Sequence, residues 1–108
     1  MTRIYLSGPI KGNTDYIEDF DKAEEDVYNL FSGTDNVTVI NPAGLRYVMP
    51  DGATWDEYMK MCIGLLDLIA GDGIVYMLPG WRKSPGACVE YGYALAHDIR
   101  IIQAERGK

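Results

Sequence analysis

The sequence has 108 residues and a mass of 12.1 kDa, which is enough for a single domain, spanning residues 1–108, with one modest core. Ten Lys and Arg against sixteen Asp and Glu give a net charge of −6, which argues against a polynucleotide or an anionic membrane as a partner. No apolar run is long enough to span a membrane and the first residues lack the apolar core of a signal peptide, so we expect a cytoplasmic protein.

The first quarter of the sequence predicts a strand followed by a helix. Residues 3–7 form a short β-type run that ends in the turn-forming stretch GPIKGN. From Asn13 or Thr14 onward, apolar residues recur every three or four positions up to Gly33, which is typical of an amphipathic helix.

The middle of the sequence repeats this order. Residues 37–40 predict a second strand, and residues 43–53 are expected to form a loop in which a ligand could bind. Thr54 followed three residues later by Glu57 is a capping-box pattern, and a nearly apolar helix is expected behind it.

The last third predicts strand, loop, helix and strand. Residues 73–78 are continuously apolar, as in a parallel strand covered on both faces, and residues 99–103 form a final β-type run. Because strands and helices alternate, we predict a small doubly wound, three-layer α/β sandwich of the Rossmann or flavodoxin type, with a parallel sheet of about four strands. In such sheets, ligands bind beyond the carboxyl ends of the strands.

Glu90 is the most informative residue near these strand ends. It shares a helix face with Gly86, Ala87 and Ala94, small residues that allow the close approach of a sheet or a ligand. A glutamate in an early helical turn can also stay in solvent and favour the helix dipole, so the sequence leaves both interpretations open.

Other candidates have simple structural explanations as well. Ser84 before Pro85 is a typical helix start, but amide groups of the first turn, at Gly86 and Ala87, could also bind a phosphate or a sugar hydroxyl. Tyr5 could pack in the core or lie over the crevice. The loop from Trp81 to Lys83 could be a solvated turn or a lid that carries anion-binding cations.

Three segments together, IYLSGPI, the NPA loop and YMLPGWRKSPGACVEYGYA, resemble the nucleoside 2-deoxyribosyltransferase-like superfamily, and most closely a branch of small proteins common in phages and prophages. The resemblance covers nearly the whole chain and implies that Glu90 is a nucleophile on C1′ of a sugar, that Tyr5 orients Glu90, and that Asp67 is the candidate to assist the departing base. Relatives often have an aspartate nearer to Cys62 in this helix, so this chain departs from the pattern there.

The same resemblance implies an N-glycosidase or a deoxyribosyltransferase acting on a small-molecule nucleotide or nucleoside, without cofactor or metal. Serine at position 84, where the transferases are typically acidic, favours a nucleoside monophosphate. The residues expected to bind the substrate are Ser7, Gly8, Pro9, Ile10, Lys11, Asn41, Trp81, Arg82, Ser84 and Gly86.

Two other functional classes remain open from the sequence. One is a non-catalytic module that binds a nucleotide or an ADP-ribose-like signal, and the other is a structural or adaptor role. Eight tyrosines and two tryptophans exceed what one small core buries, so we also expect a homo-oligomer, at least a dimer.

Overall fold

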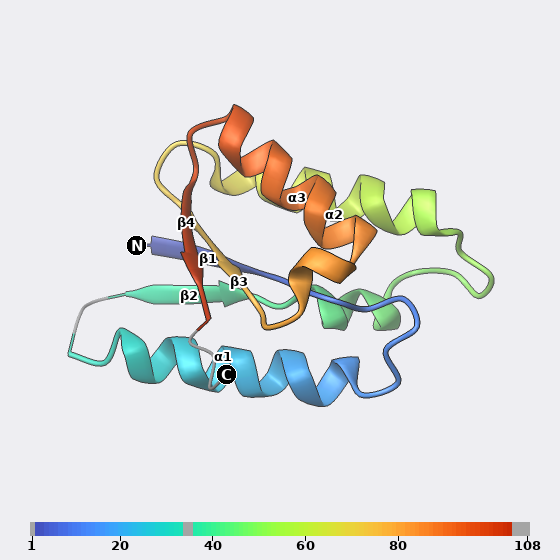
Figure 1. Ribbon diagram of the computed structural model, residues 1–108, viewed down its shortest axis with the longest axis horizontal. Coiled ribbons are helices and arrows are strands. Elements are labelled where there is room, and N and C mark those ends of the chain that lie inside the picture. Colours follow the sequence, from blue (N-terminus) through green and yellow to red (C-terminus); the bar gives the residue numbers. More distant parts are fainter. Residues whose placement is uncertain (1, 34–35, 105–108) are drawn as a thin grey trace.

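The computed structural model describes residues 2–33 and 36–104, and its centre is a four-stranded, entirely parallel sheet (Figure 1). The strand order is β2-β1-β3-β4. The strands are β1 (Thr2–Ser7), β2 (Val37–Ile40), β3 (Ile74–Met77) and β4 (Arg100–Gln103). All four lie within one or two residues of the predicted positions.

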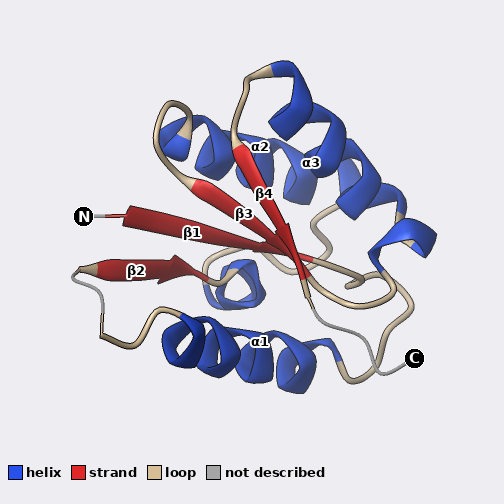
Figure 2. Ribbon diagram, turned by 60° about the vertical axis from the view of Figure 1, so that its left-hand side comes forward, coloured by secondary structure: helices blue, strands red, loops and turns tan. Residues whose placement is uncertain are grey.

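Helices cover both faces of the sheet (Figure 2). One face carries α1 (Tyr16–Leu30), and the other carries α2 (Trp55–Ile69) and α3 (Pro85–Ala96). The core is accordingly divided in two, with Phe20 and Val27 on the α1 side and Leu66 and Ala94 on the other. The predicted α/β fold, a Rossmann or flavodoxin-like sandwich, is confirmed.

The order of the strands places a crevice at the centre of the sheet. From β1 the chain crosses through α1 to β2 on one side, and then returns past β1 to β3 and β4 on the other. Ser7 at the end of β1 is in register with Met77 at the end of β3, so both strands end at the same level. This reversal of direction is the position where doubly wound sheets bind ligands.

The predicted helix starts are largely confirmed. The Thr54 side chain accepts a hydrogen bond from the Glu57 amide at 3.2 Å, and Glu57 accepts one from the Thr54 amide at 2.7 Å. Helix α1 begins later than expected, at Tyr16, because the Asn13 side chain accepts a hydrogen bond from the Asp15 amide and holds a turn before the helix.

One predicted loop contains a short helix. Residues Pro42–Tyr47 form the 3₁₀ helix η1, and the Asn41 side chain caps it by accepting a hydrogen bond from the Ala43 amide at 3.0 Å. The sequence suggested only a loop because a 3₁₀ helix of six residues makes about two turns, which is too short to show an apolar periodicity. No helix within the described residues is long and apolar enough to cross a membrane.

Candidate active site

The carboxylate of Glu90 is buried and held by two hydroxyl groups from the central strand. Tyr5 Oη donates a hydrogen bond of 2.7 Å to Glu90 Oε2, and Ser7 Oγ donates one of 2.6 Å to Oε1. The Glu90 side chain is 5% exposed, and Tyr5 and Ser7 are fully buried. Since a carboxylate offers about four acceptor positions, the two hydroxyls and a hydrogen bond from Cys62 leave at least one for a ligand.

The surroundings of Glu90 set the protonation states of the cluster. Burial raises the pKa of Glu90 above its ordinary value of 4.5, although hydrogen bonds from Ser7 and Tyr5 oppose this shift. Burial and the nearby Glu90 charge raise the pKa of Tyr5 well above 10, so its phenol stays protonated and donates. The same two causes raise the pKa of Cys62 to about 12, so Cys62 is a neutral thiol.

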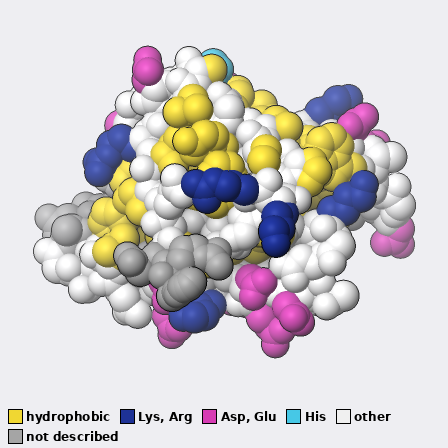
Figure 3. Space-filling view, in the orientation of Figure 1, with side chains coloured by type: hydrophobic (Ala, Val, Ile, Leu, Met, Phe, Trp, Pro, Cys, Tyr) yellow, Lys and Arg dark blue, Asp and Glu magenta, His cyan; other side chains and the backbone are white. Residues whose placement is uncertain are grey.

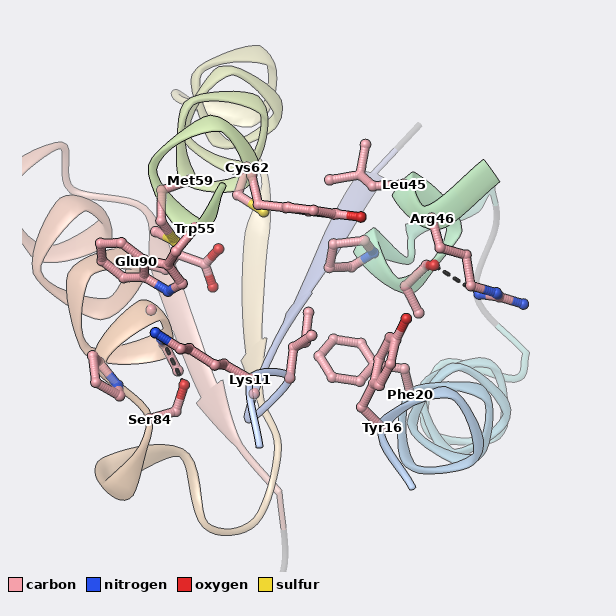
Figure 4. Close-up of a pocket in the computed structure, with 18 of the residues that line it drawn as sticks. Lys11, Tyr16, Phe20, Leu45, Arg46, Trp55, Met59, Cys62, Ser84 and Glu90 are labelled. Carbon is pink, nitrogen blue, oxygen red and sulfur yellow. Dashed lines mark hydrogen bonds between the residues drawn. The ribbon is translucent and has the colours of Figure 1, made fainter. Parts of the chain in front are cut away.

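A cavity of about 410 Å³ lies over this cluster, and Glu90 forms part of its wall. Figure 4 shows two groups of side chains facing each other across the cavity. Trp55, Met59, Ser84 and Glu90 lie on one side, and Tyr16, Phe20, Leu45 and Arg46 lie on the other. The volume is in the range of pockets that hold small organic ligands.

Lys11 extends between these two groups, and its ammonium end points toward Ser84 at the start of α3 (Figure 4). Lys11 and Arg46 are the two cationic side chains among the described lining residues. An anionic group of a ligand can therefore be bound at the same end of the cavity as Glu90.

The start of α3 forms part of the cavity wall. Ser84 Oγ accepts a hydrogen bond from the Ala87 amide at 3.2 Å, so the predicted cap is confirmed, and that amide is not free for a ligand. Gly86 lies close to α2, since an added Cβ would lie 3.2 Å from Met59 Sδ. A side chain at position 86 would therefore require the Met59 side chain, which lines the cavity, to shift by a few tenths of an ångström.

Gly8 has a similar role at the end of β1. An added Cβ would lie 2.7 Å from Leu78 Cβ, a contact too short without movement of the chain. Leu78 also donates a 2.8 Å backbone hydrogen bond to the Ser7 carbonyl. The absence of a side chain at Gly8 thus allows the segments after β1 and β3 to run side by side beneath the cavity.

Most of the residues predicted around Glu90 do come together. Tyr5 and Ser7 contact Glu90 directly, and the cavity is lined by Gly8, Ile10, Lys11, Ser84 and Gly86. Ser7 differs from the expectation in one respect, because its hydroxyl is bonded to Glu90 and supports the carboxylate.

Asp67, Asn41 and Pro9 do not line this cavity. Asp67 is exposed, and its Oδ1 accepts a 2.9 Å hydrogen bond from Tyr93 at the junction of α2 and α3. Asn41 donates hydrogen bonds to Asp21 and Glu24 of α1, and Pro9 lines a different cavity between α1 and the sheet.

The loop from Trp81 to Lys83, for which the sequence left a solvated turn or a lid open, has its tryptophan in the protein core, while Arg82 and Lys83 are exposed. Trp81 is 7% exposed and stacks on Tyr91, with ring centroids 4.5 Å apart. The Arg82 guanidinium lies over the Trp81 ring and donates to Gln103 at 3.3 Å. The expectation that these two residues bind the substrate has no support in their positions, because tertiary packing has turned the indole inward.

The far wall of the cavity was not predicted. It consists mainly of Tyr16, Phe20, Leu45 and Arg46, which come from α1 and η1. The apolar spacing of α1 indicated that Phe20 is buried, but not that the first turn of this helix stands beside a ligand cavity. The same limit applies to Trp55 and Met59, which come from the start of α2.

These features define a class of protein: a small doubly wound α/β domain with a buried, hydroxyl-supported carboxylate in a cavity at the reversal point of its sheet. Residues 2–103 match the family model described as Domain of unknown function (DUF4406), and the chain belongs to this family. Searches of curated proteins and of solved structures found no match. The described residues contain no group of three or more His, Cys, Asp or Glu side chains placed to hold a metal ion.

Proposed function

We propose that this protein is an N-glycosidase or deoxyribosyltransferase-type enzyme that cleaves the base–sugar bond of a nucleoside 5′-monophosphate or nucleoside, with Glu90 as the nucleophile. The observation that supports this most is the geometry of Glu90. Its carboxylate is buried in the wall of a ligand-sized cavity, and each of its oxygens is oriented by a separate hydroxyl. The sequence resemblance to the nucleoside 2-deoxyribosyltransferase-like superfamily agrees with this assignment.

In the proposed reaction, a Glu90 oxygen attacks C1′ of the sugar and forms a glycosyl ester while the C1′–N bond breaks. The base leaves with the electron pair of that bond and takes up a proton. Water then attacks C1′ to release the sugar, or a second base attacks to give a new nucleoside. Tyr5 and Ser7 fix the carboxylate and stabilise its charge when the glycosyl group departs.

The cavity suits the three parts of such a substrate. The sugar would lie over Glu90, and a 5′-phosphate would lie near Lys11 and the start of α3. The flat base would lie in the half that is lined by Tyr16, Phe20 and Leu45. Asp67 does not line the cavity, so the proton for the leaving base would come from another group or from water.

The experiment is incubation of the protein with a panel of deoxynucleosides and their 5′-monophosphates, with and without an added second base. Released or exchanged base is measured by chromatography, and a sugar adduct on Glu90 is sought by mass spectrometry. We expect Glu90→Gln to lose at least about 10³-fold in turnover, since an amide cannot form the ester. Asp67→Asn is the matched control, because it removes a carboxylate outside the cavity and is expected to retain turnover.

A second candidate function is binding of a nucleotide or an ADP-ribose-like signal without catalysis. It is favoured by the fact that Glu90 is the one carboxylate among the described lining residues, so no second acid faces the leaving base. Calorimetric binding of a nucleotide with no base released from any substrate of the panel would support this candidate and contradict the enzyme.

A further inference from the structure

The solvent face of α3 carries no charged side chain. Glu90 is the one residue among Asp, Glu, Lys, Arg and His in Pro85–Ala96, and it is buried. The exposed residues are Pro85, Cys88, Val89, Gly92, Leu95 and Ala96. Figure 3 shows hydrophobic side chains gathered in the upper part of the view, over the region that α3 occupies in Figure 1.

Gly92 stands in the middle of this face without any reason inside the chain. An added Cβ would meet nothing within 4 Å, and its backbone is ordinary helix. A glycine within a helix costs roughly 0.8–1 kcal/mol relative to alanine. A close approach of another backbone would explain both the glycine and the exposed apolar side chains around it, since Val89 is 46% and Leu95 is 57% exposed.

The residues around Gly92 are arranged so that the helix matches a copy of itself. Cys88 and Leu95 are two helical turns apart and form one row, and Val89 and Ala96 form a second row on the other side of Gly92. If two copies pack antiparallel about a two-fold axis at Gly92, each row meets the same row of the second copy. Leu95 then faces Cys88 of the second copy and Val89 faces Ala96, so each large side chain meets a small one.

We propose that two copies of this chain form a dimer through the exposed face of α3, packed antiparallel about Gly92. The pairing of each large side chain with a small one under the two-fold axis favours a second copy at this face. The net charge of −6 opposes the association of two copies in general, and a face without charged side chains is where two acidic molecules can meet without opposing carboxylates. This proposal is independent of the proposed reaction.

Light scattering at tens of micromolar tests the interface. The unmodified protein is expected to have twice the mass of one chain, and Leu95→Lys and Gly92→Lys are expected to have the mass of one chain. Gly92→Lys has room in the single chain, so circular dichroism should show an intact fold. Leu30→Lys is the matched control, because Leu30 is 60% exposed at the end of α1 on the opposite face of the sheet, and it should stay dimeric.

Disulfide formation tests the antiparallel register. Under mild oxidation, Leu95→Cys should form a disulfide with Cys88 of the second copy and run as a covalent dimer on a non-reducing gel. Adding Cys88→Ser should abolish this band. The unmodified protein should not cross-link, because its two Cys88 residues would lie about 12 Å apart along the helices, beyond the ~7 Å that a disulfide allows.

A monomeric unmodified protein would overturn the proposal. So would dissociation by Leu30→Lys with no effect of Leu95→Lys, or a disulfide between the two Cys88 residues of the unmodified dimer. Each of these results would show that the chain has no α3 interface or that its register differs.

Discussion

Tyr5 and Glu90 lie 85 residues apart in the sequence, and the phenol of one donates a 2.7 Å hydrogen bond to the carboxylate of the other. This contact joins the central strand to α3 at the reversal point of the sheet. It also couples the chemistry of the candidate nucleophile to the hydrogen-bond donors around it, which gives the site a measurable pH dependence.

Replacing Tyr5 by Phe should move the pH–rate profile. The Tyr5 hydrogen bond lowers the pKa of Glu90 against the effect of burial, so its loss should raise that pKa further. We expect the ascending limb of kcat/KM against pH to shift to higher pH and the maximum rate to fall. Ser7→Ala should act in the same direction, because Ser7 also donates to the carboxylate. If the midpoint of the ascending limb stayed unchanged in both variants, the two hydroxyls would not be setting the pKa of Glu90.

Glu90→Gln should make the folded protein more stable at neutral pH. The pKa of Glu90 is higher in the folded chain than its ordinary 4.5, so folding disfavours its ionised form. As pH rises from 4.5 through the raised pKa, the unmodified protein loses stability by up to about 1.4 kcal/mol per pH unit from this group. Denaturant unfolding across pH should show an advantage of the Gln variant that shrinks as the pH falls toward 4.5. If the stability difference between the Gln variant and the unmodified protein grew as the pH fell, the pKa of Glu90 would be lowered by folding and this prediction would be wrong.

Lys11 and Arg82 should differ in their effect on phosphate binding. Lys11 lines the cavity, whereas Arg82 lies over Trp81 and outside it. Calorimetry should show Lys11→Met weakening the binding of a nucleoside 5′-monophosphate by about 10- to 100-fold, the value of a lost charge-assisted hydrogen bond. Arg82→Met should leave it unchanged, and neither change should affect the unphosphorylated nucleoside. An equal loss of affinity for the 5′-monophosphate in both variants would show that Arg82 also binds the phosphate.

Trp81 and Trp55 offer a matched pair for separating core from cavity. Trp81 is 7% exposed and packed on Tyr91, so Trp81→Ala should cost roughly 3–5 kcal/mol in the free energy of unfolding. Trp55 is 38% exposed and lines the cavity, so Trp55→Ala should cost clearly less stability and weaken ligand binding. Urea denaturation and calorimetry measure the two effects. A small loss of stability in Trp81→Ala would instead favour the interpretation of the Trp81–Lys83 loop as a lid over the cavity.

The elements of the fold were predictable because their signals are local. The Thr54–Glu57 capping box and the serine–proline pair at position 84 mark two helix starts, and the apolar run at residues 73–78 marks a central strand. The small neighbours of Glu90 indicated that it could lie on the inner face of α3, but the sequence left a solvent-facing glutamate open as well, and only the packing of α3 on the sheet decides for the inner face.

The far wall of the cavity and the fate of Trp81 could not be predicted in the same way. Which side chains meet across the cavity depends on how α1, η1 and α2 pack, and no spacing within a single segment records that packing. Trp81 follows a strand among turn-forming residues, where exposure is the ordinary expectation. Its burial results from long-range packing in the core and from stacking on Tyr91. Asp67 is the opposite case: its place about one turn after Cys62 in the helix suggested a residue of the site, but it lies at the exposed junction of α2 and α3, bonded to Tyr93.

Gly8 has a consequence for any mutational scan of this protein. Position 8 has no functional group, yet a methyl group there would push against Leu78 and disturb the chain that carries Ser7 to Glu90. A substitution at Gly8 would therefore be scored with the loss-of-function variants of the carboxylate cluster. The residues on which activity depends and the residues that perform chemistry would then form two different sets, and Gly8 would belong only to the first.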